Sequence, residues 1–213
     1  MKMKYEWRKQ EKTTYATKKQ PQLLTIPAQT FMSIHGTGNP NGPEFQTHLQ
    51  TLYPAAYGLK HAYKQYAQTQ ACEFDDYVVF PLEGVWSLTI KGQQLDHLDK
   101  DEFSYDIMIR VPDFVPTELI APALAAVKAK KQLPTEQINV QQFDAMQVAQ
   151  ILHVGAYDDE PASFAKIDEL VANQGMHRTS KIHREIYLSD ARRVTPDTVS
   201  YTHLRAHETG RNL

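Results

Sequence analysis

The chain opens with a polar, Lys-rich stretch, and apolar residues begin to recur regularly only after about residue 22. We interpret residues 1–22 as a basic arm that packs on the edge of the domain. Tyr5 and Trp7 favour docking, because large aromatic side chains seek burial. The alternative is a tail that binds nucleic acid.

The first half then alternates short apolar segments with amphipathic ones. Alternating positions in Leu23–His35 predict one strand, which contains Pro27. A turn at 36–42 leads to a helix that begins at Pro43 and has apolar residues at helical spacing. Further strands are predicted within 77–91 and over 103–112, followed by a helix over 121–131.

The second half repeats this order. Gln147–Gly155 predicts a strand, Pro161 opens a helix that Gly175 caps, and Ile182–Leu188 predicts another strand. MSIHGTGNPNGPEF in the first half can be laid over QILHVGAYDDEPASF in the second, so that His35 and His153 end corresponding strands. We therefore predict an α+β fold of two β-α-β-β units, with an antiparallel sheet around a ligand cavity between the copies.

Composition narrows the class of protein. The chain has 213 residues, 41% of them hydrophobic, and a formal net charge of −2, which supports a real core and gives no global attraction to nucleic acid. It has one cysteine, Cys72, no zinc-ligand spacing, no signal-peptide core and no apolar run of about 18 residues. We expect a cytoplasmic protein without a membrane contact, a metal or another cofactor.

Several segments together resemble the GyrI-like small-molecule-binding family, which is related to effector-binding domains of bacterial transcription activators. The matching segments are PAQTFMSIHGTGNPNGPEFQ, LYPAAYGLK, YVVFPLEGVW, MIRVPDFV, ILHVGAYDDEPASFAKIDEL and KIHREIYLSDARR. The resemblance implies a ligand cavity between duplicated halves. It also implies that some members only bind ligands, others hydrolyse cyclopropane-containing toxins, and others relieve inhibition of DNA gyrase.

Glu185 is the main catalytic candidate. It lies inside the apolar strand IHREIYL, where a carboxylate is costly unless something pairs with it or uses it. The alternative is an exposed residue paired with Arg184 or Lys181. The resemblance implies that Glu185 faces the cavity, where it could attract a cation or, with a raised pKa, act as a general base on water. Tyr157, in the turn after Gly155, could orient the ligand or water, although it could equally pack the turn.

Four further residues are candidate ligand contacts. Pro81 and Gly84 interrupt the strand that carries Glu83 and Trp86, as bulges beside sites do, and Trp86 could form an apolar or cation–π wall. The alternative is a core tryptophan with a solvated glutamate. The other two candidates, Tyr105 and Phe114, could line the cavity or simply pack the core. We expect His35 and His153 to be structural, and Cys72 has no recognisable activating partner.

The last residues resemble a sequencing artefact. VSYTHLRAHET, Val199–Thr209, is what one reading frame of a common tagmentation adaptor encodes, so we interpret residues 199–213 as a non-native tail. Family members carry a further short strand here, and we therefore expect the second copy to be truncated. His203 and His207 have helical metal spacing, but no third ligand is indicated, and we reject a metal site on them.

These interpretations divide the chain into the arm 1–22, a GyrI-like domain over 23–198 and the tail 199–213, with repeats at about 23–115 and 140–198. The predicted function is binding of small hydrophobic or cationic molecules, with hydrolysis of strained electrophilic toxins by a glutamate base. The alternative is a protein that sequesters drugs without chemistry or modulates DNA gyrase. No DNA-binding helix-turn-helix precedes the domain, so direct contact with nucleic acid is not expected.

Overall fold

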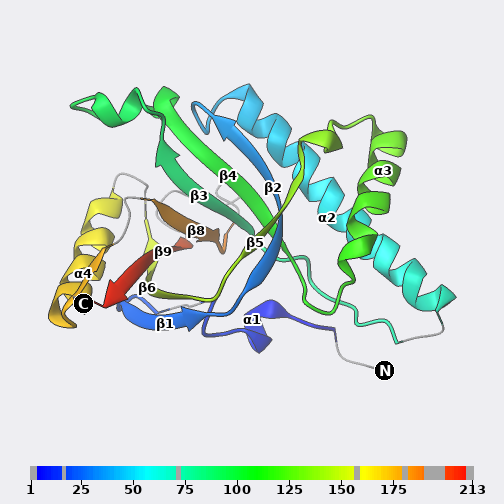
Figure 1. Ribbon diagram of the computed structural model, residues 1–213, viewed down its shortest axis with the longest axis horizontal. Helices are drawn as coiled ribbons and strands as arrows, with labels where there is room; N and C mark the ends of the chain where they lie inside the picture. The colour runs from blue at the N-terminus through cyan, green and yellow to red at the C-terminus, as the bar shows by residue number, and fades with distance from the viewer. Residues whose placement is uncertain are drawn as a thin grey trace. The chain divides into compact units, whose positions relative to one another are not determined.

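The computed structural model describes residues 4–15, 18–70, 73–155, 159–178, 182–189 and 200–209 (Figure 1). It confirms an α+β fold with antiparallel strand pairs. The chain forms two compact units. Unit 1 comprises Met1–Gln10, Gln29–Phe80 and Leu88–Phe143, and unit 2 comprises Glu11–Ala28, Pro81–Ser87 and Asp144–Leu213.

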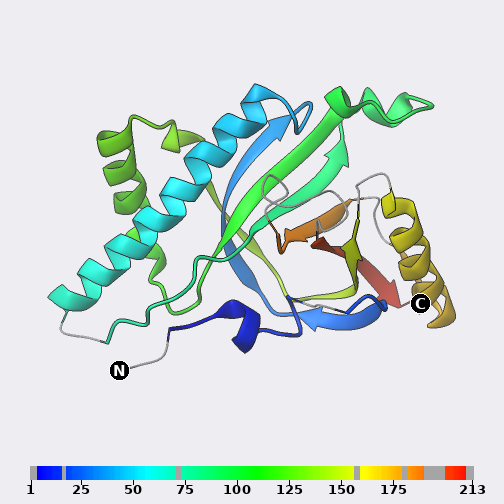
Figure 2. The same cartoon turned by 180° about the vertical axis from the view of Figure 1, so that it is seen from behind.

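Unit 1 is built on a sheet in which β2 (Gln29–Thr37) lies between β4 (Phe103–Val111) and β5 (Asn139–Phe143). The long helix α2 (Pro43–Thr69) crosses one face of β2 and β4, and α3 (Ile120–Lys131) packs beside it (Figure 2). Pro43 starts α2 because the first helical position needs no backbone N–H donor. Short 3-10 turns lie at Gly92–Gln94, Lys100–Glu102, Thr117–Leu119 and Thr135–Gln137.

The core of unit 1 follows from strand alternation. Ile34 is paired with Ile107 in the sheet, and Met32 is paired with Ile109, and these side chains are almost completely buried. Leu52 and Leu59 of α2 are buried to the same degree, together with other apolar residues at helical spacing. The apolar face of this sheet is therefore used for packing.

The first part of the N-terminal arm docks on unit 1. Tyr5 forms an isolated parallel bridge with Tyr77, and Trp7, in α1 (Trp7–Gln10), is 5% exposed. The Trp7 indole N–H donates to the carbonyl of Val79 at 3.2 Å. From Glu11 onward the arm belongs to unit 2, where the Thr14 carbonyl accepts a hydrogen bond from the Gln150 amide.

Unit 2 contains a sheet in the order β1-β6-β9-β8-β3, with β7 paired to β9. Helix α4 packs on β6 and β7 around Ala149, Ile151, Ile167, Val171 and Met176. The bounds of its elements are β1 Gln22–Ile26, β3 Leu82–Leu88, β6 Met146–Val154, α4 Glu160–Asn173, β7 Met176–Arg178, β8 His183–Tyr187 and β9 Ser200–Thr209.

The predicted single strand over Leu23–His35 is two strands, and this prediction was wrong. β1 ends at Ile26 and pairs with β6 in unit 2, whereas β2 begins at Gln29 in unit 1. Pro27 lies between them and has no N–H to continue a ladder, so it separates two strands that belong to different units.

The expectation that the second copy lacks its last strand is also wrong. Ser200–Thr209 forms β9, which pairs with both β6 and β8. Tyr201, Thr202 and His203 are each 0% exposed, so both faces of this strand start are covered. The adaptor-like origin of these residues stays a prediction, because any stretch with suitable alternation can close a sheet.

No helix within the described residues combines the length and apolarity needed to cross a membrane.

Candidate functional site

Glu185 lies in β8 on the side of the unit 2 sheet that α4 covers. It is paired with Gly84 of β3 on one side and His203 of β9 on the other. Directly paired residues share a face, and so do residues two apart along a strand. Trp86, His183 and Tyr187 therefore lie on the same face as Glu185.

Both oxygens of Glu185 have hydrogen-bond partners. Tyr187 Oη donates to Glu185 Oε2 at 2.6 Å, and His183 Nε2 lies 3.1 Å from Oε1. The indole N–H of Trp86 donates to Tyr187 Oη at 2.8 Å. Glu185 is 4% exposed and Trp86 is 7% exposed, so this network is inside the unit.

The network keeps Glu185 ionised. Burial pushes the pKa of Glu185 upward, but the hydrogen bond and charge of His183, followed by His203 and Tyr187, outweigh it. The net pKa of Glu185 lies below its ordinary value of 4.5. The direction is thus opposite to the raised pKa considered for a general base, and the carboxylate is charged at neutral pH.

Gly84 makes room for this network. A Cβ at Gly84 would lie 2.6 Å from the Trp86 Nε1 atom and 3.4 Å from the Tyr187 hydroxyl oxygen. The β3–β8 register runs without interruption from Glu83 to Trp86, so the expected bulge at Gly84 is not present. Gly84 is needed for space beside the indole.

Glu83 lies on the opposite face of the sheet from Glu185. Its Oε2 accepts a hydrogen bond from Arg184 Nε at 2.6 Å, and Glu83 is 0% exposed. The alternative that Glu185 is an exposed partner of Arg184 is therefore wrong, because strand alternation sends Arg184 to Glu83. Lys181, the other suggested partner, lies outside the described residues.

His183, Glu185 and His203 form a cluster that could hold a metal ion, with ligand atoms within 4.8 Å of one another. His203 Nδ1 is 3.6 Å from Glu185 Oε1. The sequence-based rejection of a metal at His203 assumed that no third ligand existed, and that reason was wrong. His203 belongs to the adaptor-like segment, so the preceding chain supplies only His183 and Glu185.

The two strand-end histidines are not equivalent, contrary to the sequence overlay. His35 is exposed and lies 3.2 Å from Asp106, on the face of its sheet away from Tyr105. His153 is buried, and its Nδ1 is 2.9 Å from Ser163 Oγ in α4. The overlay is therefore out of phase by one residue: His153 faces α4, whereas His35 lies on the opposite face from the one that contacts α2.

The other predicted residues lie elsewhere. Tyr105 is in unit 1, where its hydroxyl is 3.2 Å from His48 Nδ1, and burial with the charge of Glu44 raises the pKa of Tyr105 to about 12. Phe114, also in unit 1, packs against the rings of Tyr5, Tyr63 and Tyr77. Tyr157 and Cys72 lie outside the described residues.

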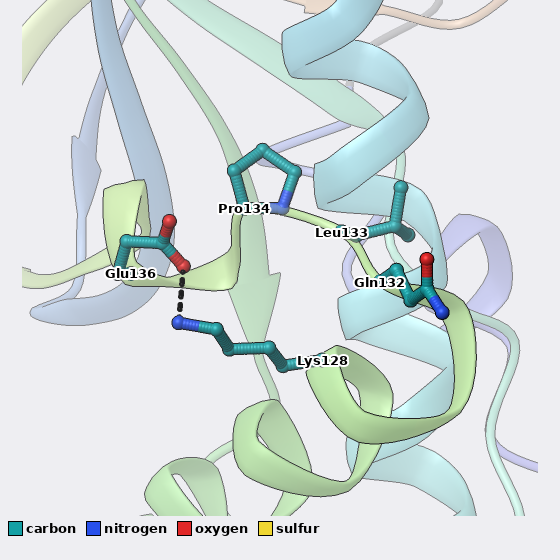
Figure 3. Close-up of a pocket in the computed structure, with 5 residues that line it drawn as sticks. All are labelled: Lys128, Gln132, Leu133, Pro134 and Glu136. Atoms are coloured by element: carbon teal, nitrogen blue, oxygen red, sulfur yellow. Dashed lines mark ion pairs between the residues drawn. The ribbon is translucent and has the colours of Figure 1, made fainter.

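A shallow hollow of about 350 Å³ lies at the end of α3 in unit 1. Lys128 Nζ lies 3.0 Å from Glu136 Oε2. Figure 3 shows the two side chains pointing toward each other. Gln132, Leu133 and Pro134 complete its lining. Both charged side chains are more than half exposed, and no aromatic ring lines the hollow. It therefore lacks the buried charge and the aromatic side chains that surround Glu185.

Sequence reasoning missed His183 and Tyr187. Both are two residues from Glu185 in a predicted strand, so alternation alone places them on its face. That signal was present in HREIY. What the sequence did not contain was the pairing of β8 with β3, which brings Trp86 to Tyr187.

Known proteins share this architecture. An uncharacterised conserved protein from Listeria innocua is 28% identical, with 96% of this chain and 100% of that chain covered and a TM-score of 0.83. A hydrolase from Listeria innocua is 27% identical, with 97% and 100% covered and a TM-score of 0.82. The EcmrR C-terminal domain, 14% identical with 89% and 98% covered and a TM-score of 0.51, shares the fold alone.

No curated protein matches the chain. A family model of the GyrI-like small molecule binding domain matches residues 19–205. That match includes the strands carrying Trp86, Glu185 and His203 and most of the described chain. The chain therefore belongs to the GyrI-like small molecule binding domain family.

Proposed function

We propose that the chain binds a small hydrophobic or cationic organic molecule beside Glu185 and hydrolyses it when it carries a strained electrophilic ring. The observation that carries this proposal is the buried, ionised Glu185 carboxylate held by His183 and Tyr187. A carboxylate inside a sheet is costly, and such groups concentrate at functional sites.

The proposed reaction adds water to the ligand. Glu185 accepts a proton from water as the water oxygen bonds to a ring carbon, and a ring C–C bond breaks. The electron pair of that bond stays on the second carbon or a conjugated carbonyl, which takes up a proton. Similarity to the Listeria innocua hydrolase, at 27% identity, supports hydrolysis as the class of reaction.

Binding without chemistry is the second candidate function, and the pKa of Glu185 favours it. A carboxylate with a lowered pKa is a weak base but a permanent negative charge at neutral pH. Such a group suits recognition of an organic cation. A role at DNA gyrase stays a prediction.

Turnover separates the two functions. We expect the wild-type chain to consume an activated cyclopropane conjugated to a carbonyl group, measured by absorbance and by mass spectrometry of the hydrated product. Glu185→Gln should lower kcat/KM by about 100-fold or more, in the range for loss of a general base. The exposed Glu118→Gln, in unit 1, is the matched control.

Two outcomes decide the proposal. Full turnover by Glu185→Gln would contradict the catalytic role. A second outcome is that no form shows turnover and that Glu185→Gln binds rhodamine 6G more weakly than Glu118→Gln does. That outcome would contradict hydrolysis and support binding without chemistry. Fluorescence anisotropy of rhodamine 6G measures that affinity directly.

A further inference from the structure

Trp86 takes part in the hydrogen-bond network of Glu185 through Tyr187, a role that differs from the ligand wall considered for it from the sequence. As a ligand-facing wall it would present its ring, but it is 7% exposed and its N–H is used inside the protein. The indole N–H can only donate, so Tyr187 Oη must be the acceptor at 2.8 Å. The hydroxyl has a single proton, which is then directed to Glu185 Oε2 at 2.6 Å.

We infer that Trp86 is a positioning residue, which acts on Glu185 through Tyr187. Its indole fixes the direction of the Tyr187 proton, and that proton holds Oε2 of the carboxylate. Oε1, which lies 3.1 Å from His183 Nε2, is then the oxygen that acts on a ligand or a water molecule. This inference rests on the proposed function, in which Glu185 acts on the ligand, but its main test is made in the ligand-free protein.

Gly84 is part of the same arrangement. It is paired with Glu185 across β3 and β8, and a methyl group there would collide with the Trp86 Nε1 atom at 2.6 Å. The indole reaches Tyr187 because position 84 carries no side chain. Gly84→Ala should therefore displace the indole N–H while keeping the tryptophan.

The test measures the pKa of Glu185 in the ligand-free protein, by NMR titration of ¹³C-labelled glutamate carboxyls. Glu185→Gln assigns the resonance. Tyr187→Phe should raise the pKa of Glu185 by about one pH unit, because it removes a hydrogen bond to the charged form. Trp86→Phe and Gly84→Ala should each raise it by roughly half as much.

The double variant Trp86→Phe/Tyr187→Phe gives the sharpest readout. Because the two residues act in series, the double variant should match Tyr187→Phe alone. Trp7→Phe is the matched control, since that indole N–H donates to the Val79 carbonyl in unit 1. It should leave the pKa of Glu185 unchanged.

An unchanged pKa in Trp86→Phe, or additive shifts in the double variant, would overturn the inference. A Trp86→Phe variant that changes KM but not the pKa would make Trp86 a ligand wall, which also overturns it. If Trp86→Phe does not fold, benzothienylalanine at position 86 removes the N–H with almost no change of shape. Failure of the proposed function would appear separately, as unchanged turnover and binding in Glu185→Gln.

Discussion

The helix-facing sides of the two sheets have the same layout but different chemistry. In unit 1, Tyr105 contacts α2 through His48, and two residues further along the strand Ile107 is paired with Ile34. In unit 2, Tyr201 contacts α4 through Glu160, and two residues further along the strand His203 is paired with Ile151.

The difference lies in what each sheet does with its buried face. Apart from the Tyr105–His48 contact, unit 1 fills it with isoleucine, methionine and leucine, which are stabilised by burial. Unit 2 has an apolar cluster under α4 as well, but it adds a carboxylate, a tyrosine and histidines, and such groups cost stability unless they are fully bonded. These buried polar residues of unit 2 are the reason that we propose ligand chemistry there.

The largest effect should come from placing a polar side chain of the unit 2 type in the apolar core of unit 1. Ile107→His removes a fully buried apolar side chain and places an imidazole among isoleucines. We expect a loss of about 4 kcal/mol in the free energy of unfolding, from the lost apolar burial and the polar group together. Urea unfolding followed by circular dichroism measures this, and a loss below about 1 kcal/mol would contradict the contrast between the units.

The second prediction separates the two carboxylates of unit 2. Glu83→Gln leaves the buried Arg184 guanidinium without the Glu83 carboxylate, and should cost about 3 kcal/mol of unfolding free energy. The same measurement on Glu83→Gln should show this loss while rhodamine 6G binding at low temperature is retained. Loss of binding by the folded variant would mean that the Glu83 face also takes part in the site.

The third prediction concerns acid. Burial lowers the pKa of His48 below 6.5, helped by His35 and opposed by Glu44, so the unfolded chain takes up this proton first. Unit 1 should lose stability as the pH falls below about 6.5. Glu185 has a lowered pKa, so its contribution is complete above about 4.5 and is lost as the pH falls through its lower folded value.

Hydrogen exchange measures the two responses separately. After correction for intrinsic rates, amides of β2 should lose protection between pH 7 and 5, and His48→Gln should abolish that change. Amides of β8 should keep the part of their protection that depends on Glu185 until lower pH. Parallel loss in the two strands, unaffected by His48→Gln, would show that His48 does not set the acid response of unit 1.

The smallest effect is expected when a buried polar residue of unit 2 is replaced by the apolar residue of unit 1. His203→Ile replaces a buried imidazole by the residue that unit 1 carries at the corresponding place, and the unfolding free energy should change by less than about 1 kcal/mol. The pKa of Glu185 should rise, since His203 helps to lower it. A destabilisation of several kcal/mol would instead make His203 an essential part of the cluster.

Much of this fold was readable from the chain. Proline at helix starts and period-two alternation located α2, α4, β4 and β8, and six segments spread along most of the chain together identified the family. Pro27 was read as part of a strand, although its missing N–H ends β1 there.

The site was only partly predictable, because its key contacts join distant segments. Glu185 was identified because a carboxylate in an apolar strand is unusual. His183 and Tyr187 could have been added by alternation, but the bond from Trp86 to Tyr187 spans 101 residues and depends on the β3–β8 register. The one-residue offset between His35 and His153 likewise depends on which face each helix covers.

The central claim is that the ligand binds beside Glu185 in unit 2. The most direct test asks which glutamate carboxyl group responds to an added ligand. In a protein with ¹³C-labelled glutamate, rhodamine 6G is added and all carboxyl resonances are followed, with Glu185→Gln and Glu44→Gln as assignment variants. We predict that the Glu185 resonance moves with saturation and that the resonance of Glu44, in the first turn of α2 in unit 1, stays in place. A saturable change at Glu44 with none at Glu185 would contradict the assignment of the ligand site to unit 2.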